Sequence, residues 1–525
     1  QYAPMLLRFA GKFISPFFAE DIVHDVFLKI WDKQVFLLSE SEVKNILFVA
    51  SECVPFIKTG GLADVVGTLP KMFDKNEYDC RVILPNYRCI PDKFRNNFKY
   101  VHHFYMDMGQ RFSSVHVGIM EYEYDGITFY FVDNLFYFGG DKPYADTRYD
   151  IEKFTYFSKS VLAILPVVGF RPDIIHCHDW QAGLVPVYLH TIYKDNPFYY
   201  GTKTIFTIHN LRFQGVWDID TIKALSGLPD YVFTPDKLEF NKDANMLKGG
   251  LVYSDFITTV SNTYAGEIQT GYYGEGLDGL LRARNQSLCG IVNGIDYQAY
   301  NPETDTCIAK QYSTRSIKKG KAANKKALQQ ELGLPVDENK FVISIISRLT
   351  DQKGLDLVRY ALDRICDEFT QFVVVGTGDP QYENLFREYA MRMPGRVSAN
   401  IFFNEGFAHK VYAASDAVLV PSLFEPCGLT QLIALRYGTV PIVRETGGLK
   451  DTVQPYNEFD GTGIGFSFAN YNGDELLGTI NYAKHIYFDC RKEWDQMVSR
   501  GMKTDYSWTN SARKYEELYN RVLGR

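Results

Sequence analysis

Short, uninterrupted apolar runs recur along the chain from about residue 44 and alternate with segments of helical spacing. Because these runs are continuous rather than alternating, they predict strands that are buried on both faces of a parallel sheet. The first series of expected strands is 46–50, 81–84, 128–132, 173–176, 204–208, 256–260 and 288–292. The second series is 341–346, 372–375, 401–403, 417–420 and 440–443.

A polar and basic segment, 301–326, separates the two series and carries no strong strand pattern. The chain length of 525 residues also exceeds what one hydrophobic core usually organises. We therefore expect an α/β protein in which two doubly wound, Rossmann-like domains, 44–296 and 297–503, face each other across a cleft. Residues 1–43 do not share this pattern, and the amphipathic spacing at 19–31 predicts a helical appendage.

The composition excludes several classes of partner. A net charge of −7 and a pI near 5.9 argue against nucleic acid and are compatible with a neutral polymer. Nine scattered cysteines are typical of reduced thiols in a cytoplasmic protein. The run from His176 to Asp179 has no second ligand cluster, so no metal is expected. No apolar stretch approaches the ~20 residues of a membrane span, so no membrane partner is expected.

A glycine loop follows the first expected strand. Lys58 precedes Gly60 and Gly61, and apolar residues then recur at helical spacing. Backbone N–H groups and the helix dipole favour an anion at such a helix start, and the Lys58 ammonium adds a full positive charge. An ordinary strand-to-helix turn has the same local pattern, so the pattern alone leaves both interpretations open.

Two other expected strands of the first domain end in polar residues. Asp179 follows 173–176, and His209 and Asn210 follow 204–208. Ligands of doubly wound domains bind beyond the carboxyl ends of the strands, where a carboxylate can hold a sugar hydroxyl. The alternatives are structural: Asp179 as a helix cap, and His209 as a hydrogen-bonded histidine without a catalytic role.

The loops of the second domain carry charge. Arg348 and Lys353 lie five residues apart after 341–346, so they can hold a diphosphate between a planar fork and a point charge. After 417–420, Gly428 opens a second helix start, and Glu425 offers a carboxylate to the cleft. On an open surface the two cations would simply be solvated.

These motifs resemble those of the glycogen and starch synthases, and the resemblance runs from about residue 44 to the end of the chain. The position eight residues after Glu425 is Ile433, where many other nucleotide-sugar transferases of this architecture have a second glutamate. The resemblance implies a GT-B glycosyltransferase without a cofactor. Such an enzyme transfers glucose, with retention, from ADP-glucose to the non-reducing end of an α-1,4-glucan acceptor. It also implies that a terminal helix, 504–525, returns to the first domain.

The resemblance assigns roles to individual positions. The implied catalytic residues are Lys58, Asp179, His209, Arg348, Lys353 and Glu425. The implied substrate-binding residues are Gly60, Gly61, Asp64, Asn210, Asn293, Phe403, Cys427, Gly428, Leu429 and Thr430. Phe403 matches a position where an aromatic ring stacks on the nucleotide base. Whether Glu425 acts as a nucleophile or stabilises positive charge on the sugar stays open.

Several alternatives remain at this point. No residue visibly decides between ADP-glucose and UDP-glucose as the donor. A transferase with a different donor or acceptor is the first alternative, and a non-catalytic glucan-binding or regulatory protein is the second. Residues 19–31 resemble a helix of bacterial extracytoplasmic-function sigma factors. The DNA-reading region of those factors is missing here, so a fused or artefactual segment is expected rather than a role in transcription.

Overall fold

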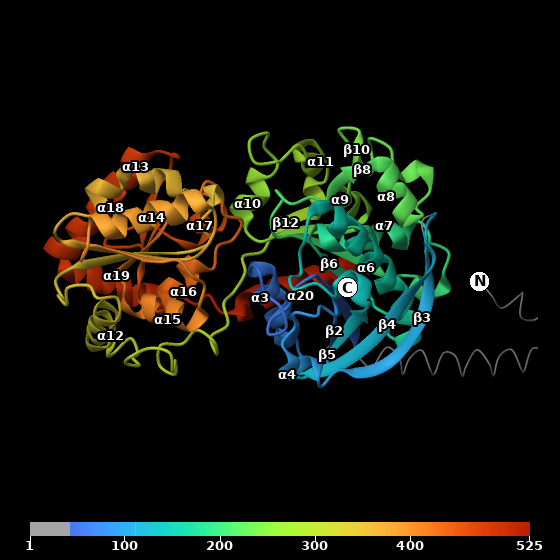
Figure 1. Ribbon diagram of the computed structural model, residues 1–525, viewed down its shortest axis with the longest axis horizontal. Helices are drawn as coiled ribbons and strands as arrows, with labels where there is room; N and C mark the ends of the chain where they lie inside the picture. The colour runs from blue at the N-terminus through green and yellow to red at the C-terminus, as the bar shows by residue number, and fades with distance from the viewer. Residues whose placement is uncertain (1–42, 111, 525) are drawn as a thin grey trace, which may run out of the picture.

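The computed structural model describes residues 43–110 and 112–524, so the helix expected at 19–31 lies outside the described residues. The described chain forms two α/β lobes, each built around its own sheet (Figure 1). In this part of the chain no helix is long and apolar enough to cross a membrane.

A nine-stranded sheet forms the centre of the first lobe, in the order β12-β11-β7-β6-β1-β2-β5-β4-β3. Its strands are β1 (Lys44–Val49), β2 (Tyr78–Pro85), β3 (Lys99–Met108), β4 (Phe112–Tyr124), β5 (Ile127–Asp133), β6 (Ile174–His178), β7 (Lys203–Ile208), β11 (Phe256–Thr259) and β12 (Leu288–Gly290). Neighbours from β12 to β5 are parallel, whereas β4 pairs antiparallel with β5 and β3. A small antiparallel sheet, β8 (Val216–Asp218), β10 (Asp243–Asn245) and β9 (Glu239–Phe240), belongs to the same lobe.

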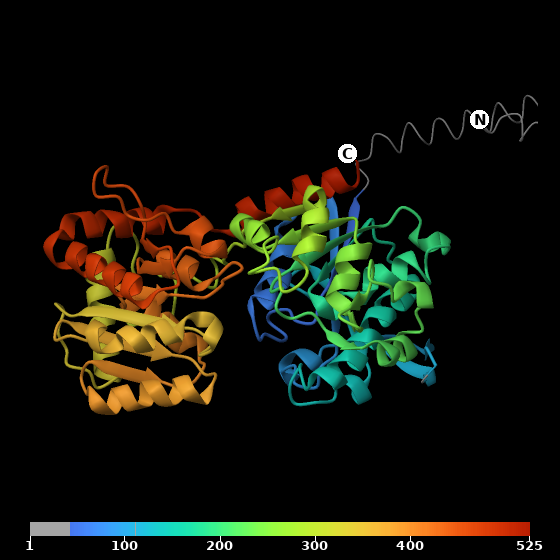
Figure 2. The same cartoon turned by 90° about the horizontal axis from the view of Figure 1, so that it is seen from above.

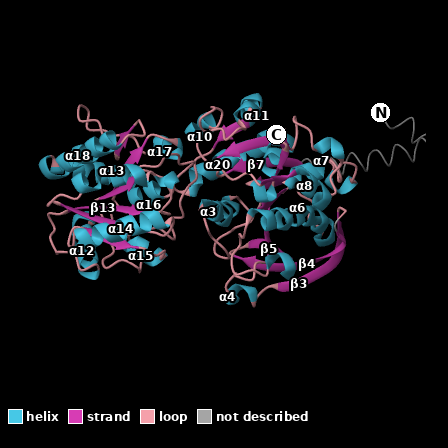
Figure 3. Cartoon of the chain, turned by 45° about the horizontal axis from the view of Figure 1, so that its top comes forward, coloured by secondary structure: helices cyan, strands magenta, loops and turns pink. Residues whose placement is uncertain are grey.

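The second lobe contains a six-stranded sheet that is parallel throughout, in the order β15-β14-β13-β16-β17-β18. Its strands are β13 (Phe341–Ile346), β14 (Thr370–Val375), β15 (Val397–Asn400), β16 (Ala417–Val420), β17 (Val440–Arg444) and β18 (Phe466–Phe468). Helices lie on both faces of this sheet, as in a doubly wound domain (Figure 3).

Helices connect the strands in both lobes. Those of the first lobe are α3 (Gly61–Thr68), α4 (Asp92–Arg95), α5 (Leu135–Phe138), α6 (Thr147–Val168), α7 (Leu184–His190), α8 (Ile219–Ser226), α9 (Met246–Tyr253), α10 (Asn262–Glu267) and α11 (Asp278–Ala283). Those that follow are α12 (Ile317–Glu331), α13 (Leu355–Ile365), α14 (Pro380–Arg392), α15 (Glu405–Ala414), α16 (Thr430–Arg436), α17 (Gly447–Thr452), α18 (Gly473–Asp489), α19 (Arg491–Lys503) and α20 (Trp508–Val522).

One expected strand is wrong. Residues 401–403 form no strand, and the edge strand is instead β15 at Val397–Asn400. The apolar side chains that suggested a strand are not in the sheet, since Phe402 is 43% exposed and Phe403 is 74% exposed. The actual strand has one buried apolar residue, Val397, followed by three small or polar, half-buried residues, so its apolar signal is weak.

The strand orders define where each sheet reverses. In the first lobe β1 lies between β6 and β2, and in the second lobe β13 lies between β14 and β16. Ligands of open α/β sheets bind at such switch points, beyond the carboxyl ends of the strands. The loops after β1, β6, β13 and β16 are therefore the places where a site is expected.

The chain crosses between the lobes twice, near Ile295 and again near Tyr506, and the two crossing segments lie side by side. The N–H of Ile295 donates to the carbonyl of Tyr506 at 2.8 Å, so the outgoing and returning segments pair. Helix α20 then packs into the first core, where Tyr515 and Tyr519 are fully buried (Figure 2). A second contact joins the lobes at α10 and α17, where Asp451 accepts hydrogen bonds from the N–H and the hydroxyl of Thr263.

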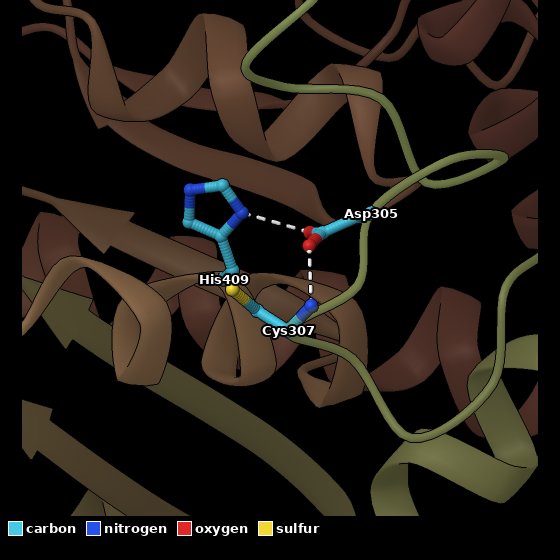
Figure 4. Close-up of side chains that lie close together, drawn as sticks. All are labelled: Asp305, Cys307 and His409. Carbon is cyan, nitrogen blue, oxygen red and sulfur yellow. Dashed lines mark hydrogen bonds and ion pairs between the residues drawn. The ribbon is translucent and has the colours of Figure 1, made fainter.

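The segment after the first passage is fixed to the second lobe by a cluster of side chains (Figure 4). His409 Nδ1 lies 2.7 Å from Asp305 Oδ2, and the N–H of Cys307 donates to Asp305 Oδ1 at 2.8 Å. The Tyr437 hydroxyl also donates to Asp305 Oδ2, at 2.5 Å. These are hydrogen-bond distances, and both oxygens of the carboxylate are engaged. The buried polar groups of this cluster therefore hydrogen-bond to one another, and these bonds attach the segment that carries Asp305 and Cys307 to α15 and to the end of α16.

Candidate active site

The glycine loop after β1 is held by a buried carboxylate. Glu52, 4% exposed, accepts hydrogen bonds from the N–H groups of Thr59 and Gly60, the latter at 3.3 Å. It also accepts from the hydroxyls of Thr59, at 2.6 Å, and Tyr144, at 2.5 Å. The first two donors of the loop therefore point at a protein carboxylate rather than outward. The anion site expected here retains only the donors at the start of α3, where no side chain caps the helix.

The Lys58 side chain in this loop is already paired with a carboxylate. Its ammonium lies 2.7 Å from Asp64 Oδ1, in a half-buried ion pair. Burial raises the pKa of Asp64, and the Lys58 charge opposes that rise. Gly61 lies next to the second lobe, because a Cβ built on it would be 3.8 Å from Leu429 Cδ1. The structure thus brings two predicted substrate-binding loops together, one from each lobe.

The ends of β6 and β7 meet through Asp179 and His209. Asp179 Oδ1 accepts the backbone N–H of His209 at 2.7 Å. Burial raises the pKa of Asp179 to about 7, although N–H donors from His209 and Asn210 oppose this. Burial also lowers the pKa of His209 to about 3, so its imidazole is neutral. Asn210 Oδ1 accepts the N–H of Arg212 at 3.1 Å, so its side chain belongs to a local turn.

Arg348 and Lys353, both after β13, have different surroundings. Arg348 is exposed, and its guanidinium has no ion-pair or hydrogen-bond partner among the described residues. Lys353 Nζ lies 2.6 Å from Glu425 Oε2, with both side chains largely buried. The Ser422 hydroxyl donates to the same oxygen at 2.9 Å. The carboxylate predicted to face the transferred sugar therefore holds one of the cations predicted to hold the phosphate.

A neighbouring glycine loop supports the Arg348 loop. The N–H of Leu349 donates to the carbonyl of Thr377 at 2.9 Å, and the N–H of Asp379 donates to the carbonyl of Leu349 at 2.8 Å. A Cβ on Gly378 would lie 2.2 Å from the Leu349 carbonyl oxygen, so only glycine permits this approach. The backbone that carries Arg348 is thus fixed although its side chain is free.

The loop from Cys427 to Thr430 connects Glu425 to α16. Gly428 has φ of +74°, a conformation that favours glycine. The amide of Gln431 donates to the carbonyls of Cys427 and Gly428, at 3.0 and 2.8 Å. The Thr430 hydroxyl donates to Ile346 at 3.3 Å, which connects this loop to β13. These bonds hold the end of β16 against the end of β13.

Two predicted residues lie at the margins. Asn293 is 4% exposed, and its Oδ1 meets no hydrogen-bond donor among the described residues. Its backbone N–H bonds to the Cys427 sulfur, so it joins the inter-lobe passage to the second lobe. Phe403 is 74% exposed, which leaves its ring faces open for stacking. The roles of both in substrate binding stay predictions.

Sequence reasoning missed two residues of this region, Glu52 and His178. Glu52 holds the glycine loop, and His178 Nδ1 lies 2.9 Å from His209 Nε2. The one available signal was position, because His178 is the last residue of β6 and Glu52 lies three residues after β1, in or before loops that had been singled out. No contact is observed between Arg348 and the other predicted cations, so the structure leaves a shared phosphate site as a prediction.

Two Rossmann-like lobes with loops converging from both sheets form the architecture known as GT-B. The solved sucrose-phosphate synthase of Thermosynechococcus elongatus shares this fold, with a TM-score of 0.59 at 16% identity over 92% of this chain and 99% of its own. The family model described as starch synthase catalytic domain matches residues 45–283, and that described as glycosyl transferases group 1 matches 325–499.

Similarity to particular enzymes is much closer. The glycogen synthase of Lachnospira eligens is 62% identical over 91% of this chain and 100% of its own, and that of Bacillus cereus is 50% identical with the same coverage. The solved catalytic domain of starch synthase IV from Arabidopsis thaliana, bound to ADP and acarbose, has a TM-score of 0.82 at 31% identity, covering 92% of this chain and 100% of its own. The chain belongs to the glycogen synthase family and is a glycosyltransferase. The sigma-factor resemblance of 19–31 receives no support from these matches.

Proposed function

We propose that this protein extends α-1,4-glucan by transferring glucose from ADP-glucose to the non-reducing end, with retention of configuration and release of ADP. The observation that carries the proposal is the Glu425–Lys353 pair at the switch point of the second sheet, next to Pro426, whose carbonyl accepts a hydrogen bond from the Ser261 hydroxyl of the first lobe at 2.6 Å. The 31% identical starch synthase was solved with ADP and acarbose, which supports an adenine nucleotide and a glucan-like acceptor.

In this proposal the second lobe binds the donor and the first lobe binds the acceptor. Arg348 and Lys353 hold the diphosphate, and Lys58 approaches it from the first lobe. Negative charge grows on the phosphate oxygen as the sugar leaves, so cations placed there stabilise the transition state more than the ground state. Glu425 faces the sugar, where its carboxylate stabilises the positive charge that develops on the ring. Phe403 stacks on the adenine.

The arrangement favours electrostatic stabilisation because its groups are preorganised. Lys353, Glu425 and Ser422 already form one hydrogen-bonded unit, so little reorganisation is needed when the donor binds. Closing the lobes around the substrates excludes water, which would otherwise hydrolyse the activated sugar. The contacts at α10 and α17 give such closure a place to pivot.

The test is incorporation of labelled glucose. Purified protein is incubated with glycogen and either ADP-glucose or UDP-glucose, and chain extension is measured, with the anomeric configuration of the new linkage read by NMR. We expect extension with ADP-glucose and α-linked product. Faster extension with UDP-glucose would overturn the donor assignment, and extension of a different sugar acceptor in place of glucan would overturn the acceptor assignment.

A further inference from the structure

A stack of histidines lies behind His209 in the first lobe. His176 and His178 point to the same face of β6, with ring centroids 4.3 Å apart. His178 Nδ1 then reaches His209 Nε2 at 2.9 Å. Both residues of β6 are fully buried, whereas His209 is half-buried at the end of β7. Only the last ring of the array therefore reaches the surface of the candidate site.

Two consecutive residues of the chain hold His209. His178 contacts its ring, and Asp179 accepts its backbone N–H at 2.7 Å. In a continuing strand these neighbours would point to opposite faces. Asp179 instead has φ of +56° and ψ of −178°, a region that is almost confined to glycine. This strained backbone turns both side chains toward one partner, and such strain collects at functional sites.

The hydrogen in the His178–His209 bond can be placed. Burial holds the pKa of His178 well below its usual value, and that of His209 at about 3, so the two imidazoles are neutral and share one hydrogen. His178 Nε2 is buried and has no partner among the described residues. A hydrogen on that nitrogen would be an orphaned buried donor, which is rarer in proteins than an unused buried acceptor.

We propose that His178 is a positioning residue that donates its Nδ1 hydrogen to His209 Nε2 and thereby fixes His209 as the tautomer that carries its hydrogen on Nδ1. The bond made by one ring nitrogen decides which species the other presents. His209 Nδ1 has no partner among the described residues and is not buried. It therefore offers a hydrogen-bond donor to the site. This assignment rests on the proposed function: the His209 Nδ1 hydrogen would then bond to a hydroxyl oxygen of the transferred glucose.

The tautomer can be measured directly in the wild-type protein. Nitrogen NMR of histidine-labelled protein separates the two tautomers, and loss of one set of signals in His178→Asn assists the assignment. We expect the hydrogen on Nδ1 of both His178 and His209. A hydrogen on His209 Nε2 would overturn the proposal. This readout is independent of turnover, so failure of glucan extension and failure of the tautomer assignment are distinguishable.

Three substitutions separate hydrogen bonding from packing. In His178→Asn the amide nitrogen can occupy the place of Nδ1 and donate, so kcat is expected to stay within ~10-fold of wild type. His178→Asp offers His209 Nε2 only a hydrogen-bond acceptor, and His178→Leu offers it neither a donor nor an acceptor. In both variants we expect kcat to fall ~100-fold, whereas KM for the sugar donor should change less than ~3-fold. Wild-type kcat in His178→Asp would contradict the proposed direction of the bond.

Thr207→Val is the matched control. The Thr207 hydroxyl lies 2.6 Å from His176 Nε2, so this change disturbs the same buried cluster without touching the His178–His209 bond. We expect kcat within ~3-fold of wild type in Thr207→Val, because the ring that reaches the site keeps its partner. A loss as large as that of His178→Leu would show that the cluster acts only through stability, and would overturn the positioning role.

Discussion

The cations of the two lobes differ in what already neutralises them. Lys58 is paired with Asp64, with side-chain exposures of 31% and 21%, and Lys353 is paired with Glu425, with exposures of 15% and 9%. Arg348 has no such partner among the described residues. In the proposed donor site, a diphosphate would meet one free guanidinium and two ammonium groups that are already paired with carboxylates.

In the proposed donor site, this difference predicts a separate task for each of the three cations. Arg348 can bind an anion without losing a protein contact, so it is suited to capture the donor. Lys353 is the least exposed of the three cations. Separating it from Glu425 would leave a largely buried charge without its partner, which is costly. The Lys58–Asp64 pair is more exposed, so solvent screens it more strongly. Lys58 can therefore exchange Asp64 for a phosphate oxygen at lower cost than Lys353 can leave Glu425.

The largest effect is expected from Glu425→Gln. Loss of the carboxylate removes the charge that the proposal places beside the sugar, and it leaves Lys353 without its partner. We expect kcat to fall by ~10³-fold or more, about 4 kcal/mol of transition-state stabilisation. Steady-state kinetics measure this, with Ser422→Ala as the milder companion, because it removes one hydrogen bond and keeps the charge. A kcat within tenfold of wild type in Glu425→Gln would contradict the role given to this residue.

Arg348→Ala and Lys58→Ala test the phosphate clamp, by which we mean the proposed site where Arg348, Lys353 and Lys58 hold the diphosphate of the donor. Each variant is expected to lose at least ~100-fold in turnover, several kcal/mol. Arg359→Ala is the matched control, since this arginine is exposed on α13, outside the candidate site. Donor binding measured by calorimetry should weaken more in Arg348→Ala than in Lys58→Ala if capture depends on the free guanidinium. Near-normal activity in both variants would rule out the clamp.

Glu52→Gln probes the glycine loop of the first lobe. The neutral amide can no longer accept hydrogen bonds with both of its heteroatoms, so the loop loses part of its support. We expect KM for the donor to rise ~10-fold and the free energy of unfolding to fall by about 2 kcal/mol. Kinetics and chemical denaturation measure the two effects. An unchanged KM would show that the loop keeps its shape without this carboxylate.

The smallest effect is a pH dependence of stability. Asp179 has a raised pKa of about 7 in the folded protein, against 3.8 as its usual value, so between these values the folded state binds more protons than the unfolded state. Stability conferred by the protonated form is therefore lost as pH rises through that range. We expect wild type to lose about 1–2 kcal/mol relative to Asp179→Asn between pH 5 and pH 8. Denaturation of both proteins at the two pH values measures this, and parallel curves would contradict it.

Much of the fold follows from the sequence because its central strands are apolar along their length. β1, β7 and β13 were predicted from runs of buried residues. β3 was not, since most of its residues face solvent, and β15 was placed four residues away because an exposed aromatic pair gave a stronger apolar signal. Periodicity reports burial, so it is silent at the edges of a sheet.

The candidate site was predicted in the same uneven way. Strand ends followed by charged or glycine-rich loops marked Lys58, Arg348 and Glu425 as candidates, and the roles that the resemblance gives them stay predictions. The groups that hold them could not be found, because the partners are set by how loops meet in space. Glu52 accepts a hydrogen bond from Thr59, seven residues later in the chain, and His178 contacts the ring of His209, which follows a different strand. Spacing along a chain does not encode such contacts.

Helix α20 gives this molecule an unusual order of assembly. Tyr519, almost at the end of the chain, lies 2.9 Å from His176 in the heart of the first sheet, although the whole second lobe is encoded between them. During synthesis the first lobe is therefore translated without its last helix, and it stays incomplete until the second lobe and α20 have been translated. Domains usually fold as units from the N-terminus as they leave the ribosome. Here the earliest domain to appear is the last to be finished, so nascent chains that stall before residue 508 expose the core surface that α20 covers.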